Sequence, residues 1–132
     1  MGGLGRNPIQ VKSPVVASAV SKHRVVVATA NESEVDAPGG ANASSIVGIT
    51  QESQDTVGDP VPVTTAGIEF VEAASAIDPG DMIRIAGTGG KVETSSPATG
   101  VNDFLVGQAL GKAGADGDVI PVQIQKSVFQ GE

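Results

Sequence analysis

The sequence predicts a mainly β protein, and three features of the chain support this prediction. Val and Ile together supply 28 of the 132 residues, whereas Leu supplies 3, and β-branched side chains favour pleated strands. Eighteen Gly and eight Pro interrupt the apolar segments and mark turns. In addition, LVGQALGKAGADGDVIPV at residues 105–122 repeats the strand–turn–strand pattern of IVGITQESQDTVGDPVPV at residues 46–63.

The first residues of the chain, 1–16, predict an extended N-terminal arm. Three Gly precede a short segment between two prolines, in which Ile9 and Val11 alternate with polar residues as in a strand. Ordering such a segment opposes folding about as strongly as its apolar side chains and hydrogen bonds favour it. We therefore expect the arm to be ordered only where a groove or a sheet edge holds it.

The remaining residues, 17–132, predict a single β domain. Strands are expected at residues 25–29, 46–50, 61–65, 68–71, 82–85, 91–94, 105–110 and 119–125. Polar loops are expected at residues 31–45 and 95–103, and a single helical turn at residues 72–76. Pro79 and Gly80 predict a type II turn, because Pro presets φ at the second position and Gly permits a positive φ at the third.

The repeated phrase predicts two pseudo-repeated strand–loop–strand halves, at about residues 17–66 and 74–125. ASAV at residues 17–20 matches ASAI at residues 74–77, which extends the similarity beyond the phrase itself. A half with about three strands is too small to bury a core. The two halves are therefore expected to pack face to face or to close as a small β-barrel.

The charges are distributed unevenly along the chain. Residues 1–31 carry a net charge of +4 and residues 32–132 carry −11. An acidic body repels phosphates, which argues against a nucleic-acid partner. The sequence has no Cys, so disulfides and thiolate metal sites are excluded, and no apolar segment is long enough to span a bilayer. We expect a soluble protein made in a cytoplasm, with no membrane partner.

No catalytic or metal-binding pattern is recognisable. Carboxylates occur in pairs, but in turns and polar loops where Asp commonly bonds its own backbone; these pairs are Glu32/Glu34, Asp55/Asp59, Asp78/Asp81 and Asp116/Asp118. Asp116-Gly-Asp118 lacks the further ligands of a calcium loop, and His23 has no nucleophile motif beside it. GTGG at residues 87–90 lacks the spacing of a phosphate loop, and Lys91 does not lie in the turn itself as a lipoyl-carrier Lys does. We expect no enzyme, no metal and no cofactor.

The segment of about residues 46–125 resembles the bacteriophage capsid decoration, or cement, proteins. The resemblance is carried by AGIEFVEA, IDPGDMIRI, the GKV hairpin and LVGQAL, followed by a Gly-Asp turn and a last strand. It implies a small β-barrel or β-tulip on the outer capsid surface of the virion. It also implies a homotrimer that clamps adjacent subunits of the major capsid protein and stabilises the head, without enzymatic activity or a cofactor.

The arm is the part of the chain that we expect to bind the capsid. Its basic charge and alternating pattern suit strand addition to a capsid loop or to a neighbouring copy. The candidate contact residues are Leu4, Arg6, Ile9, Val11, Lys12 and Val15. Two alternatives remain: a β-sandwich that binds a glycan or receptor as part of a virion fibre or adhesin, which the scarcity of aromatics disfavours, and a trimeric nucleotide hydrolase, for which no motif is present.

Overall fold

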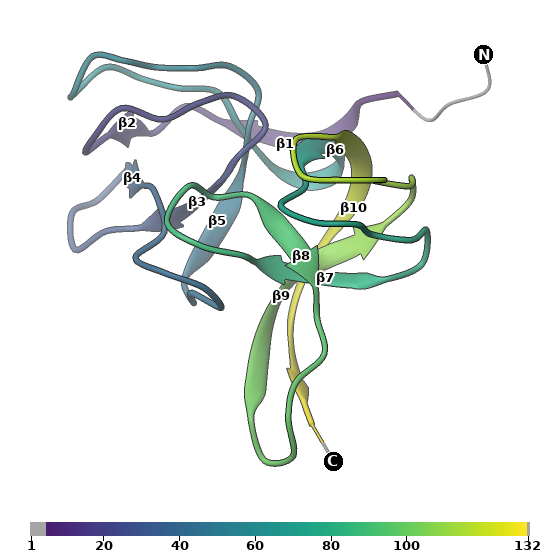
Figure 1. Cartoon of the computed structure of the whole chain (residues 1–132). Helices are drawn as coiled ribbons and strands as arrows, with labels where there is room; N and C mark the ends of the chain where they lie inside the picture. Colours follow the sequence, from purple (N-terminus) through teal and green to yellow (C-terminus); the bar gives the residue numbers. More distant parts are fainter. Residues whose placement is uncertain (1–4, 132) are drawn as a thin grey trace.

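The computed structural model describes residues 5–131, which form ten strands and no helix (Figure 1). The strands are β1 (Asn7–Lys12), β2 (Val15–Val16), β3 (Val25–Ala28), β4 (Glu34–Asp36), β5 (Ile46–Thr50), β6 (Val63–Glu72), β7 (Met82–Ile85), β8 (Val92–Thr94), β9 (Asn102–Ala109) and β10 (Val119–Gln130). No helix that could cross a membrane occurs in this described part of the chain. The prediction of a mainly β protein is confirmed.

All ten strands belong to one sheet, in the order β2-β4-β3-β5-β6-β10-β9-β7-β8, with β1 added on β6. Neighbours are antiparallel except for β2 and β4. The order is linear, and no ladder between described strands joins β2 to β8, so the sheet is open. An isolated bridge between Ala73 and Val92 brings β8 close to the end of β6 but extends no further. The predicted closure as a barrel is therefore not supported.

The repeated phrase has a local explanation in the structure. Gly48 in β5 and Gly107 in β9 each lie where a Cβ would collide with a carbonyl oxygen of the neighbouring strand, that of Thr64 and that of Gln123 respectively. The predicted division into two pseudo-repeated halves is not supported. The first part of the chain carries β1 and β2, whereas the second forms a long two-stranded ribbon of β9 and β10, so the parts are not equivalent units.

Two clusters of buried aliphatic side chains form the core. The larger cluster includes the fully buried residues Ile49, Ile77, Ile83, Ile85 and Ile120. The smaller cluster consists of Val16, Val20, Val26, Val35, Val61 and Val63. Each such side chain contributes roughly 1.5–3 kcal/mol when fully buried. The core is thus built from the Val and Ile residues that dominate the composition, without an aromatic ring in either cluster.

Some local predictions are confirmed and others are wrong. The turn at Pro79 and Gly80 is present, because Asp81 N donates to Asp78 O at 3.1 Å and Gly80 has a φ of 95°. The strands expected at residues 61–65 and 68–71 are one strand, β6. The loop expected at residues 31–45 contains β4. The helical turn expected at residues 72–76 is absent, since β6 continues to Glu72 and Ala73 bridges to Val92.

Candidate docking surface

The N-terminal arm lies along one side of β6 (Figure 1). β1 pairs antiparallel with β6, from Asn7 opposite Ile68 to Lys12 opposite Val63. All six residues of β1 are exposed, and the side chains of Ile9 and Val11 are 79% and 44% exposed. The arm is thus attached mainly through its backbone, while its two apolar side chains face solvent.

An ion pair with a buried carboxylate fastens the start of the arm. Arg6 Nε donates to Glu69 Oε2 at 2.6 Å, and the Glu69 side chain is fully buried. Thr64 Oγ1 donates to Glu69 Oε1 at 2.7 Å and Phe70 N donates to Oε2 at 2.8 Å. A buried carboxylate is unfavourable unless it is paired and hydrogen-bonded. Arg6 therefore supplies the positive charge that this position in β6 requires.

The edge of β6 is shaped to receive the arm. Gly67 has a φ of 97°, and a Cβ at this position would lie 2.5 Å from both Asn7 O and Ile9 N. A side chain here would therefore displace the arm backbone. Beside it, Thr65 Oγ1 donates to Gln10 Oε1 at 2.8 Å. We call this edge, consisting of Thr65, Gly67 and Glu69, the arm receptor.

The arm is held with little net free energy. Ordering the six residues of β1 opposes docking by roughly 6–12 kcal/mol. Ladder hydrogen bonds contribute about 1 kcal/mol each, and the bond between Arg6 and the Glu69 carboxylate about 1.5–3 kcal/mol. Because Ile9 and Val11 are exposed, the hydrophobic contribution is small. These values nearly cancel, so the docked arm is expected to open readily.

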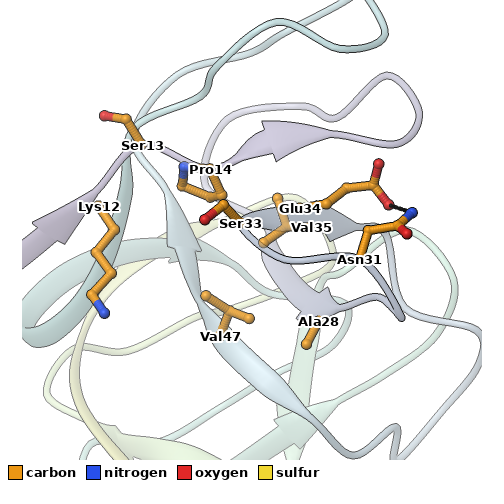
Figure 2. Close-up of a pocket in the computed structure, with 9 residues that line it drawn as sticks. All are labelled: Lys12, Ser13, Pro14, Ala28, Asn31, Ser33, Glu34, Val35 and Val47. Carbon is orange, nitrogen blue, oxygen red and sulfur yellow. Dashed lines mark hydrogen bonds between the residues drawn. The ribbon is translucent and has the colours of Figure 1, made fainter.

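A groove lies beside the end of the arm, with a volume of about 360 Å³ (Figure 2). Lys12 lies on one side of it and Glu34 on the other, and Val47 and Ala28 line the space between. Thr29 Oγ1 and Asn31 Nδ2 donate to Glu34 Oε1 at 2.7 and 3.0 Å. These hydrogen bonds lower the pKa of Glu34. The groove offers two opposite charges and an apolar floor, but no pair of groups suited to acid–base catalysis.

The structure brings most of the predicted contact residues together. Arg6, Ile9 and Val11 lie on the β1 side of β6, and Lys12 reaches the groove. Val15 belongs to β2, where its N donates to Ser33 O at 2.9 Å. The position of Leu4 lies outside the described residues. The boundary between arm and domain at residue 16 stays a prediction, although β2 already packs on the body.

Several carboxylates of the acidic pairs noted in the sequence form local hydrogen bonds or ion pairs. Asp118 Oδ2 accepts from Gly114 N at 2.7 Å, and Asp81 Oδ2 accepts from Thr94 Oγ1 at 3.0 Å. Lys91 Nζ forms ion pairs with Asp116 at 2.7 Å and Glu72 at 3.0 Å, which raise the pKa of Lys91. Within residues 5–131, no group of three or more His, Asp or Glu side chains could hold a metal ion.

A second exposed surface was missed in the sequence. β10 leaves β6 after Ile124 and continues beside β9 alone, as a two-stranded ribbon that projects from the body (Figure 1). The last six residues of β10 are exposed, and Val128 and Phe129 are 57% and 45% exposed. The motif KSVFQ at residues 126–130 could have signalled this, because it is an apolar pair outside any predicted strand.

Comparison with known proteins identifies the family. Residues 10–124 match the model of the phage cement protein family. Among solved structures, the chain is similar to the N base of the head fiber gp8.5 of bacteriophage phi29, with a TM-score of 0.62 and 20% sequence identity over 92% of this chain and 98% of that chain. At this identity the likeness shows the fold alone, and no curated protein sequence matches the chain. Since the family model spans both the arm receptor and most of the sheet, the chain belongs to the phage cement protein family.

Proposed function

We propose that this chain is a decoration protein that binds the outer surface of an icosahedral phage head and stabilises it by clamping adjacent subunits of the major capsid protein. Membership of the phage cement protein family associates the chain with the phage capsid. The observation that carries the finer proposal is β1, a strand that is fastened to the body yet presents Ile9 and Val11 to solvent. Exposed apolar side chains on an open strand edge are characteristic of interaction surfaces.

In this proposal the arm docks on the capsid by strand addition. One side of β1 is paired with β6, and no described strand pairs with its other side. An extended segment of the major capsid protein can add to that side through backbone hydrogen bonds. Ile9 and Val11 then pack against apolar capsid side chains, and Lys12 lies at the end of the contact.

A clamp needs a second contact, and we propose that self-association as a homotrimer supplies it. The exposed Val128 and Phe129 of the β9–β10 ribbon offer an apolar surface apart from the arm. Linked copies bind a shell with high effective concentration, so that modest individual contacts suffice to hold neighbouring capsid subunits together. The acidic body and the absence of a recognisable catalytic pattern favour a structural function over an enzymatic one, and no nucleic-acid or membrane partner is proposed.

The function can be tested with mature heads that lack the protein. The full chain should occupy such heads and raise the temperature at which they release DNA. A variant lacking residues 1–12 should lose at least roughly tenfold in affinity, the equivalent of about 1.4 kcal/mol. The truncation stops at residue 12 because Val16 is fully buried in the body. If the full chain fails to occupy any mature head, the function is wrong. If the truncated chain binds equally well, the arm has no part in it.

A second candidate function is that of a virion fibre, since the phi29 protein of similar fold is named a head fiber. In this alternative the chain forms part of a virion fibre and binds a glycan or a receptor. The low aromatic content speaks against a sugar site, because only three Phe are present. A glycan array separates the candidates, since a decoration protein should give no specific signal on it, whereas a receptor-binding module should bind a defined group of glycans.

A further inference from the structure

We propose that the arm receptor is also occupied in trans, by residues 6–12 of a second copy of this chain, so that associated copies exchange arms. The inference rests on the proposed self-association and specifies the contact through which copies join. It follows from two features of the molecule: a receptor that fits this chain's own arm, and an arm that can leave its own receptor.

The arm receptor is selective for this segment rather than for any extended strand. A generic strand would satisfy only the backbone groups of β6. The buried Glu69 additionally requires a cation at one place, which Arg6 supplies at 2.6 Å. Gly67 accommodates the close approach of the backbone at Asn7 and Ile9, and Thr65 bonds the Gln10 side chain. Charge and shape thus match residues 6–12 of the chain itself.

The arm is joined to the body by a single exposed residue, Ser13. The next residue, Pro14, is buried, and its carbonyl accepts from Val61 N at 2.9 Å, which fixes the chain at that point. All residues of β1 are exposed, so the arm can lift away without opening the core. Exchange of an element across a short hinge is a low-cost route to association.

Docking in cis and docking in trans make the same contacts in the receptor. The balance between them is therefore decided by the hinge and by the local concentration of a second copy, rather than by any new interaction. In an oligomer the neighbouring receptor is held close to the arm at all times. Each exchanged arm then also connects two bodies, which strengthens the assembly without a further surface.

Disulfide trapping tests the exchange, because the chain has no Cys of its own. Gln10 and Ala66 are opposite each other in the β1–β6 register, and opposed residues of antiparallel strands lie within disulfide range. Q10C protein and A66C protein are mixed, co-refolded and oxidised mildly, and linked peptides are identified by mass spectrometry. A disulfide between these positions can then form only between two chains. Q10C mixed with T88C is the control, since Thr88 is exposed and pairs with no strand.

We expect roughly tenfold more cross-linked product from the Q10C and A66C mixture than from the control mixture, because exchange raises the effective concentration of the two thiols. Adding R6E to the Q10C chain should return the yield to the control level. The proposal is overturned if the Q10C/A66C double variant forms only intrachain disulfides while the mixture matches its control. Sedimentation of the wild-type chain separates arm exchange from self-association. If the wild-type chain is an oligomer but the double variant forms only intrachain disulfides, exchange is contradicted and self-association is retained.

Discussion

At the scale of single residues, the burial of Glu69 is the clearest feature that the sequence did not reveal. In AGIEFVEA the large apolar residues are Ile68 and Phe70, but these are only partly buried, whereas Gly67, Glu69 and Val71 face the interior. Binary patterning fails here because a buried charge is stable only beside a partner of opposite charge. That partner, Arg6, lies 63 residues away in the chain, so the local pattern does not reveal it.

Replacing Arg6 should loosen the arm without unfolding the domain. The R6A variant removes the cation from a buried carboxylate, a change of about 1.5–3 kcal/mol in arm docking. Backbone amides of β1 should therefore lose the protection that docking gives them in the wild type and exchange with solvent at the rate of an undocked segment. Hydrogen exchange with mass spectrometry measures this, with K12A as the matched control, because Lys12 forms no ion pair within the described residues. Equal exchange in R6A and K12A would contradict the importance of the Glu69 pair.

His23 is the single histidine, and its surroundings favour the neutral form. Burial lowers its pKa below the ordinary value of 6.5, and the positive charge of Lys22 adds to the effect. Its buried Nδ1 makes no hydrogen bond within residues 5–131, and its ring contacts Phe70 edge-on. Because folding depresses this pKa, the unfolded chain binds the proton more tightly than the folded one. The contribution of neutral His23 to folding stability is complete above pH 6.5. It decreases as the pH falls towards the lower pKa of the folded state.

The H23N variant should lose this part of the pH dependence. Asn cannot titrate, and it tolerates the positive φ of 60° found at this position. Urea denaturation at a series of values between about pH 7 and 5, where His is the side chain that normally titrates, should show decreasing stability for the wild type and a flatter profile for H23N. Parallel profiles would show that His23 protonation is not linked to folding. Glu34 and Glu72, whose pKa values are lowered, act at more acidic pH.

At the scale of elements, the short strands and the course of β6 were the hardest to predict. β2 and β4 have two and three residues, too few for an alternating pattern, and they form because their backbones pair with each other. β6 was predicted as two strands since Gly67 interrupts its apolar pattern. The interruption is instead the place where the arm approaches, so a Gly inside a strand marks close backbone contact.

Substituting Gly67 should release the arm selectively. In G67A the added Cβ would meet Asn7 O and Ile9 N at 2.5 Å, whereas in G58A the added Cβ meets nothing within 4 Å, although Gly58 has a similar φ of 87°. Both variants should lose roughly 1 kcal/mol or more to the unfavourable φ. Loss of hydrogen-exchange protection in β1 should occur in G67A alone. Retained protection there would mean that β6 tolerates a side chain beneath the arm.

At the scale of the whole molecule, composition was more informative than the repeat. The excess of Val and Ile correctly predicts a mainly β protein, because it depends only on local preference. The strand order could not be predicted, since pairs such as β1 with β6 join segments far apart in sequence. The repeat predicted two equivalent halves, yet the sheet is open and unequal in its two parts, and only the local geometry at Gly48 and Gly107 is alike.

The strand in the arm was predictable from the sequence, but its exposed face was not. The alternating pattern around Ile9 and Val11 correctly indicated a strand near the N-terminus. It could not indicate which side chains would face solvent, because that depends on the buried face being supplied by β6. The basic charge of the arm is likewise partly used within the fold, as Arg6 pairs with Glu69.

The most direct test of this account is the affinity for mature heads of I9D/V11D compared with V57D. Ile9, Val11 and Val57 are all exposed, so none of these changes should alter folding. V57D therefore serves as the matched control. If the outward face of the arm docks on the capsid, I9D/V11D should weaken binding by roughly 100-fold or more, since two apolar side chains no longer become buried, while V57D binds like the wild type. Equal binding by the two variants would contradict the proposal that this face contacts the head.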